Sequence, residues 1–135
     1  MTKEEKLKII KKLGYDPYPP TSPKKTDIKE FLDNFNKNLK SKKNFWICGR
    51  IMAFRDHGKI VFIDLKDFSG RLQVILKRET TQDFENFLKI ADIGDFFGFY
   101  GFAFLPSSKE KSLLAKKWIL LSKSIKNFPK EYYKV

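Results

Sequence analysis

Three short apolar segments follow one another in the middle of the chain, and only turn residues separate them. They are Phe45–Phe54, Ile60–Leu65 and Arg71–Lys77, with the turns Arg55–Lys59 and Asp67–Gly70 between them. In the second and third segments apolar residues alternate with period two, which is the pattern of half-buried strands. The intervening turns each contain a glycine and are too short for a crossover. The sequence therefore predicts three consecutive antiparallel strands.

A helix and two more strands are predicted after these three. Thr80 or Thr81 starts the helix, whose apolar face is Phe84, Phe87, Leu88 and Ala91. Strand four is expected over Phe96–Phe104 and strand five over roughly Ser112–Leu121, with a hydrophilic loop, Pro106–Lys111, between them. This order predicts a mainly β OB-fold: a five-stranded, partly open barrel with a helix between strands three and four.

The first 44 residues predict a helical extension. Thr2 and Glu5 have capping-box spacing, and the helix that they open carries Leu7, Ile10 and Leu13 before Gly14. Tyr15–Lys25 holds four prolines and is expected to run extended as a linker.

A second helix is predicted after the linker. Thr26 or Asp27 can cap it, and its apolar face is Ile28, Phe31, Leu32, Phe35 and Leu39. Asn38–Asn44 is polar and is expected to be a loop. The predicted organisation is an extension over 1–44, an OB-fold domain over 45–128, and the start of a connection to a further domain over 129–135.

The charge indicates a polyanionic partner. Lys and Arg number 28 against 16 Asp and Glu, a formal net charge of +12, and the excess falls in both the extension and the predicted domain. One Cys and one His exclude an internal disulfide framework, a cysteine zinc site and a histidine metal centre. No nucleophile–base pair or phosphate-binding glycine loop is found, so no catalytic residue, metal or cofactor is expected in this chain. Without a secretory signal or a membrane-length apolar run, we expect a cytoplasmic protein with no membrane contact.

Strand alternation selects the candidate binding residues. If Val61 and Ile63 fill the interior, Phe62 points outward, and by the same argument Gln73 is an exposed amide. OB-folds bind single-stranded nucleic acid on this face, where a ring stacks on a base and an amide reads its edge. Arg55 stands beside them at the first hairpin. The possible phosphate contacts are Lys59, Arg71, Lys77 and Arg78.

Each of these residues also has an ordinary structural interpretation. Phe62 could pack beneath the N-terminal helices, and Arg55 and the four phosphate candidates could be solvated surface charges. His57 beside Gly58 is expected to be a turn residue rather than a base, and Asp67 to cap its turn rather than act with Asp64.

Several motifs together resemble the N-terminal domain of class II lysyl-tRNA synthetases. The central ones are Gly49–Arg55, His57–Lys59, Phe62–Leu65, Asp67 and Gly70–Gln73. Gly14–Pro19 upstream, and Leu120–Ile125 followed by Pro129 downstream, extend the resemblance over nearly the whole chain.

The resemblance implies that the domain binds the anticodon loop of lysine tRNA. Phe62 would stack on the central uridine, Gln73 would read the same base and Arg55 would contact the anticodon. Glu110, in the loop between strands four and five, would help to read the third base. Here the chain departs from the family, which has Gly and Leu where Lys109 and Lys111 flank this glutamate.

The resemblance also implies a longer parent enzyme. The family members are usually homodimeric ligases, and they charge tRNA with lysine using ATP and Mg in a catalytic domain that lies after the position of Pro129. The 135-residue chain alone is therefore expected to be inactive. Two other hypotheses remain: a general single-stranded nucleic-acid-binding OB domain, and a basic protein-interaction or dimerisation module that uses Phe31 and Phe35.

Overall fold

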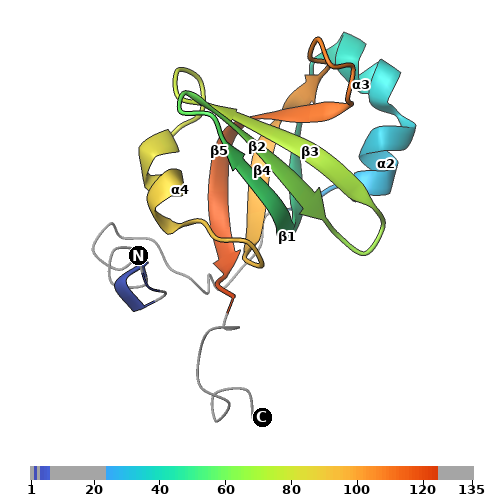
Figure 1. Ribbon diagram of the computed structural model, residues 1–135. Coiled ribbons are helices and arrows are strands. Elements are labelled where there is room, and N and C mark those ends of the chain that lie inside the picture. The colour runs from blue at the N-terminus through green and yellow to red at the C-terminus, as the bar shows by residue number, and fades with distance from the viewer. Residues whose placement is uncertain (1, 3, 7–23, 125–135) are drawn as a thin grey trace.

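The structure is a computed structural model that describes residues 2, 4–6 and 24–124. Its main element is a five-stranded sheet that closes on itself in the order β1-β2-β3-β5-β4 (Figure 1). The strands are β1 (Asn44–Asp56), β2 (Ile60–Lys66), β3 (Arg71–Lys77), β4 (Phe96–Phe104) and β5 (Ser112–Ser122). The five predicted strands and the helix between the third and the fourth are thus confirmed.

The sheet closes because β1 pairs on both sides and β3 pairs with β5. The first half of β1 pairs with β4 and its second half pairs with β2, with a register shift between Ile51 and Ala53. β3 meets β5 in parallel, over Gln73–Ile75. The pairing of β4 with β5 sets Gly101 opposite Ala115, and the Leu114 carbonyl oxygen would lie 2.0 Å from a Cβ added to Gly101, so only glycine fits there. The closed ring replaces the partly open one that the sequence predicts.

Apolar side chains from every strand fill the interior. The predicted inward residues are all at most 2% exposed: Val61, Ile63, Leu65, Leu72, Val74 and Leu76. Helix α4 (Phe84–Ile90) packs over one end of this core through Phe87. The ring of Phe87 lies 5.1–6.0 Å from the rings of Phe54, Phe97, Phe99 and Trp118.

α4 begins later than the sequence predicts. Thr81 does not start it, because its hydroxyl donates to the carbonyl oxygen of Ala115 at 2.7 Å and accepts the backbone N–H of Lys77 at 2.9 Å. These bonds tie the segment after β3 to β5, and the helix begins at Phe84, directly after Asp83, whose φ is 56°. Ala91, predicted on the helical face, follows the last helical residue.

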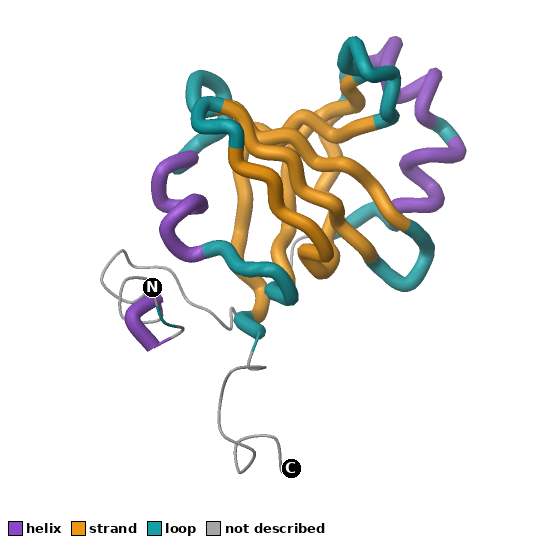
Figure 2. The backbone as a smooth tube through the Cα atoms, in the orientation of Figure 1, coloured by secondary structure: helices purple, strands orange, loops and turns teal. Residues whose placement is uncertain are grey.

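Two short helices, α2 (Ile28–Asp33) and α3 (Phe35–Ser41), pack against the sheet on the side opposite α4 (Figures 1 and 2). The sequence predicts one helix here, but the backbone leaves helical geometry at Asn34. The predicted loop over 38–44 is wrong at both ends, since α3 continues to Ser41 and β1 begins at Asn44. Ile28, Phe31 and Phe35 are buried with the interior residues of the sheet.

The turn between β2 and β3 caps α2. Oδ2 of Asp67 accepts the backbone N–H of Ile28 at 3.0 Å, and the Ser69 hydroxyl accepts that of Lys29 at 3.0 Å. Oδ1 of Asp67 also accepts N–H groups of Ser69 and Gly70, which confirms its predicted turn-capping role. Burial acts to raise the pKa of Asp67, but these hydrogen bonds outweigh it and hold the pKa below its usual value.

The described part of the N-terminus keeps one predicted contact. The backbone N–H of Glu5 donates to the Thr2 hydroxyl at 3.1 Å, which is half of the expected capping box. Lys6 pairs with Asp92 and donates to the carbonyl oxygen of Ala91. The rest of the predicted first helix, Gly14, the proline-rich linker and the 129–135 connection lie outside the described residues.

Candidate nucleic-acid interface

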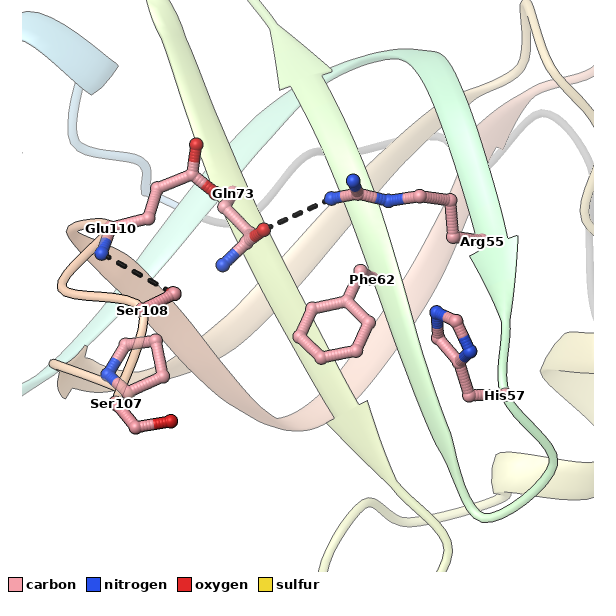
Figure 3. Close-up of a pocket in the computed structure, with 8 residues that line it drawn as sticks. Arg55, His57, Phe62, Gln73, Ser107, Ser108 and Glu110 are labelled. Carbon is pink, nitrogen blue, oxygen red and sulfur yellow. Dashed lines mark hydrogen bonds between the residues drawn. The ribbon is translucent and has the colours of Figure 1, made fainter.

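A groove of about 480 Å³ runs over β1, β2 and β3 toward the loop between β4 and β5. It is lined by Arg55, His57, Phe62, Gln73, Pro106, Ser107, Ser108 and Glu110. Arg55 and His57 lie at one side, Ser107, Ser108 and Glu110 at the other, and Phe62 and Gln73 between them (Figure 3). All four residues expected to contact the anticodon therefore line one groove.

Phe62 forms the apolar floor of the groove. It faces outward from β2 between the buried Val61 and Ile63, as alternation predicts, and it is partly exposed. The Arg55 guanidinium carbon lies 5.6 Å from the centre of its ring, and the His57 ring meets it edge-on at 5.5 Å. Among the described residues, this ring faces the groove and does not pack beneath α2 or α3.

Gln73 lies deeper than the sequence predicts. It keeps only 9% of its surface exposed, so the expectation of an exposed amide is wrong, although the side chain does face the groove. Nη2 of Arg55 donates to Oε1 of Gln73 at 3.1 Å, and Nε2 of Gln73 donates to the Ser112 hydroxyl at 2.9 Å. The burial follows from the parallel pairing of β3 with β5, which sets Ser112 beside Gln73.

Glu110 is exposed on the loop that forms the far wall. Its backbone N–H points to the Ser108 hydroxyl at 3.5 Å, and its carbonyl oxygen accepts the Ser112 hydroxyl at 2.7 Å. Lys109 adopts a left-handed conformation, with a φ of 64°, one residue before it. A second hollow of about 400 Å³ shares Arg55, Gln73 and Glu110 with the groove, so these three side chains border both spaces.

The four cations proposed to contact phosphate differ in their surroundings. Arg71 lines the second hollow and pairs with Asp64 at 3.0 Å. Lys77 lies over the Phe104 ring, 5.1 Å from its centre. Arg78 pairs at 2.7 Å with Glu85, in the first turn of α4. Lys59 is exposed in the hairpin turn, and its side chain makes no ion pair with another described residue.

Sequence reasoning missed four of the residues that line the groove: His57, Pro106, Ser107 and Ser108. His57 occupies its predicted turn, yet its ring also borders the groove and contacts Phe62. Ser107 and Ser108 lie in a loop whose composition shows only that it is hydrophilic. The signal for His57 was its position two residues after Arg55, directly after the last residue of the same strand.

Within residues 2, 4–6 and 24–124, no group of three or more His, Cys, Asp or Glu side chains is placed to hold a metal ion. Burial raises the pKa of the Cys48 thiol, which therefore stays protonated and unreactive at neutral pH. No helix in that same part of the chain is long and apolar enough to span a bilayer.

The curated proteins that this chain resembles in sequence are lysine–tRNA ligases of several organisms. The chain is 38% identical over 136 residues to a lysine–tRNA ligase of Dehalococcoides mccartyi, an alignment that covers 97% of this chain and 27% of that protein. It is 35% identical over 135 residues to lysine–tRNA ligase 2 of Methanosarcina acetivorans, covering 98% and 26%. The corresponding enzyme of Fervidobacterium nodosum is 31% identical over 127 residues, covering 92% and 25%.

The chain spans about a quarter of the length of these curated relatives. A family model described as an OB-fold nucleic acid binding domain, of the tRNA anticodon type, matches residues 45–121. That match includes all five strands except the first residue of β1 and the last of β5. The chain therefore belongs to the tRNA anticodon family of OB-fold nucleic acid binding domains.

Proposed function

We propose that this chain recognises the anticodon loop of lysine tRNA through the groove over β1–β3. The observation that carries the proposal is the convergence of Arg55, Phe62, Gln73 and Glu110 on one groove, in a chain similar to lysine–tRNA ligases over more than nine-tenths of its length. A general single-stranded binder needs a ring and positive charge, but not a buried, hydrogen-bonded amide. Gln73 therefore favours a reader of base identity.

Each side chain has a distinct part in the proposed recognition. An unstacked middle base lies on the Phe62 ring, and its edge faces Gln73 and Arg55. Glu110, on the opposite wall, accepts hydrogen bonds from the third base. Lys59, Arg71, Lys77 and Arg78 attract the phosphates, so binding weakens as salt rises.

The division of the chain follows from the same proposal. Residues 45–128 form the binding domain, residues 1–44 its extension, and residues 129–135 lead toward a catalytic domain in a longer, homodimeric class II lysine–tRNA ligase. That other domain would bind ATP, Mg and lysine. The role of the present chain is to select the tRNA.

Replacing the floor of the groove tests the proposal. Phe62→Ala should weaken binding of a fluorescently labelled lysine anticodon stem-loop by about 1–3 kcal/mol, because the stacking surface is lost. Phe68→Ala is the matched control, since that ring is 84% exposed on the turn between β2 and β3 and does not line the groove. An unchanged affinity for Phe62→Ala, or an equal loss for Phe68→Ala, would contradict the stacking role.

A further inference from the structure

Ser112 is wholly buried at the first position of β5, where it touches the proposed base-reading amide. Its oxygen lies 2.7 Å from the carbonyl oxygen of Glu110 and 2.9 Å from the Gln73 side chain. A carbonyl oxygen only accepts, so the single hydroxyl proton of Ser112 is directed to Glu110. Toward Gln73, Ser112 can therefore only accept a hydrogen bond.

This constraint fixes which end of the Gln73 amide faces which neighbour. The NH₂ group must face Ser112, because Ser112 has no second proton to donate. Arg55, which only donates, requires the amide oxygen on the other side. The two neighbours enforce the same orientation, although they come from β1 and β5, at opposite sides of β3.

The fixed amide leaves a defined pattern for a ligand. Gln73 has two N–H groups and two oxygen lone pairs, and one of each is used by Ser112 and Arg55. The unused N–H, the unused lone pair and a further N–H of Arg55 stand in the order donor, acceptor, donor. Uracil presents acceptor, donor, acceptor with O4, N3–H and O2, whereas cytosine presents donor, acceptor, acceptor. An amide that was free to rotate could read either base.

We propose that Ser112 is a specificity-determining positioning residue: by fixing the Gln73 amide, it makes the groove select an imide base edge, such as that of uracil, over cytosine. This inference rests on the proposed function, because it presumes that a base enters the groove. Ser112 itself does not line the groove and acts through Gln73.

The test compares two anticodon stem-loops that differ only in a uridine or a cytidine at the middle position. The wild-type chain should prefer the uridine loop by about tenfold or more, and Ser112→Ala should reduce this ratio to about threefold or less. Ser122→Ala is the matched control, because it removes a hydroxyl from the far end of the same strand, which does not line the groove, and should keep the wild-type ratio. Preferences at the flanking positions should change little in either variant.

The outcomes separate this proposal from the one on which it rests. No uridine preference in the wild type would contradict base reading by the groove, whereas a preference retained in full by Ser112→Ala would overturn only the role of Ser112. If Ser112→Ala does not fold, Ser112→Cys, which has a weaker acceptor of similar size, should still lower the ratio. If Ser112→Cys kept the wild-type preference for the uridine loop over the cytidine loop, the role of Ser112 would be overturned.

A measurement without RNA examines the amide directly. In NMR spectra of the free chain, the two side-chain N–H protons of Gln73 should have well separated chemical shifts, because one of them is bonded to Ser112. Ser112→Ala should bring the two shifts closer together. Unchanged shifts would show that Ser112 does not fix the amide.

Discussion

Two polar clusters lie at opposite ends of β5, and they use their hydrogen-bonding groups differently. At the start of the strand, Ser112 and Gln73 join the exposed Arg55 and Glu110, and groups on the groove side remain available. Just beyond its end, the Lys123 side chain is 2% exposed and donates to the carbonyl oxygen of Ile90 and to two carboxylates, those of Asp92 and Asp95.

The second cluster is satisfied within the protein. Asp95 is fully buried and also accepts the backbone N–H groups of Asp92 and Ser124. It thereby ties the segment after α4 to the chain beyond β5. A buried ion pair whose hydrogen-bonding groups are used within the protein forms a structural joint, whereas a cluster that keeps spare donors and acceptors toward a groove offers a place for a ligand.

The largest expected effect comes from removing Lys123 from the second cluster. Lys123→Met should lower the free energy of unfolding by about 3–5 kcal/mol, because it takes the Lys123 cation away from the buried Asp95 carboxylate. Urea denaturation measures this loss. Lys116→Met, at an exposed position of β5, should change stability by less than about 0.5 kcal/mol. Similar stabilities for the two variants would show that the joint is unimportant.

A substitution in the first cluster, which borders the groove, should change RNA binding rather than stability. Gln73→Ala should reduce discrimination at the middle base by about 1–3 kcal/mol, because the edge-reading amide is removed. Titration with matched and mismatched anticodon loops at one salt concentration measures this change. Non-specific affinity should fall by much less. Equal losses on both loops would show that Gln73 supports binding without reading the base.

A third kind of polar contact, the cap of α2, should have a smaller effect. Asp67→Ala should destabilise the fold by about 1 kcal/mol, as the loss of a helix cap does. Asp33→Ala, which breaks an exposed pair with Lys29, should cost less than about 0.5 kcal/mol. Equal urea midpoints for the two variants would contradict the cap.

The lowered pKa of Asp67 also gives this contact a pH dependence. The folded pKa lies below the ordinary value of 3.8, so the stabilisation is present above pH 3.8 and is lost as pH falls through the folded pKa. The stability difference between the wild type and Asp67→Ala should therefore shrink in acid. A difference that stays constant down to pH 2 would contradict the assignment.

The smallest effect is expected for one surface cation. Lys59→Ala should reduce the slope of log affinity against log salt by about 0.7, the value for one phosphate contact on a single strand. Arg78→Ala should change the slope less, since Arg78 already pairs with Glu85. A larger change of slope for Arg78→Ala than for Lys59→Ala would place the phosphates on the α4 side of the groove.

The fold could be predicted from the sequence wherever the signal was local and periodic. Apolar segments bounded by turns and loops located all five strands, and alternation identified Val61, Ile63, Leu72 and Val74 as interior residues. It failed where distant segments decide the outcome. Thr81 is bound to Ala115, which delays α4, and α2 is capped from a turn about 40 residues away.

The candidate site could likewise be predicted in part: its residues were found, but the contacts between distant segments were not. Alternation turned Phe62 and Gln73 toward the groove, and the position of Arg55 at the first hairpin placed it beside them. Glu110 came from the family resemblance, and all four residues line the groove. The burial of Gln73 and its hydrogen bond to Ser112 were not predictable. They depend on the parallel pairing of two strands 39 residues apart, which no local pattern encodes.

The most direct measurement compares two RNA loops on the unmodified 135-residue chain. One is the lysine anticodon stem-loop and the other has the same stem with a scrambled loop, both titrated at the same salt concentration. The account predicts that the lysine loop binds about tenfold tighter or more, because at least one base is read in the groove. Equal affinities would show a general single-stranded nucleic-acid binder, and would contradict recognition of the anticodon.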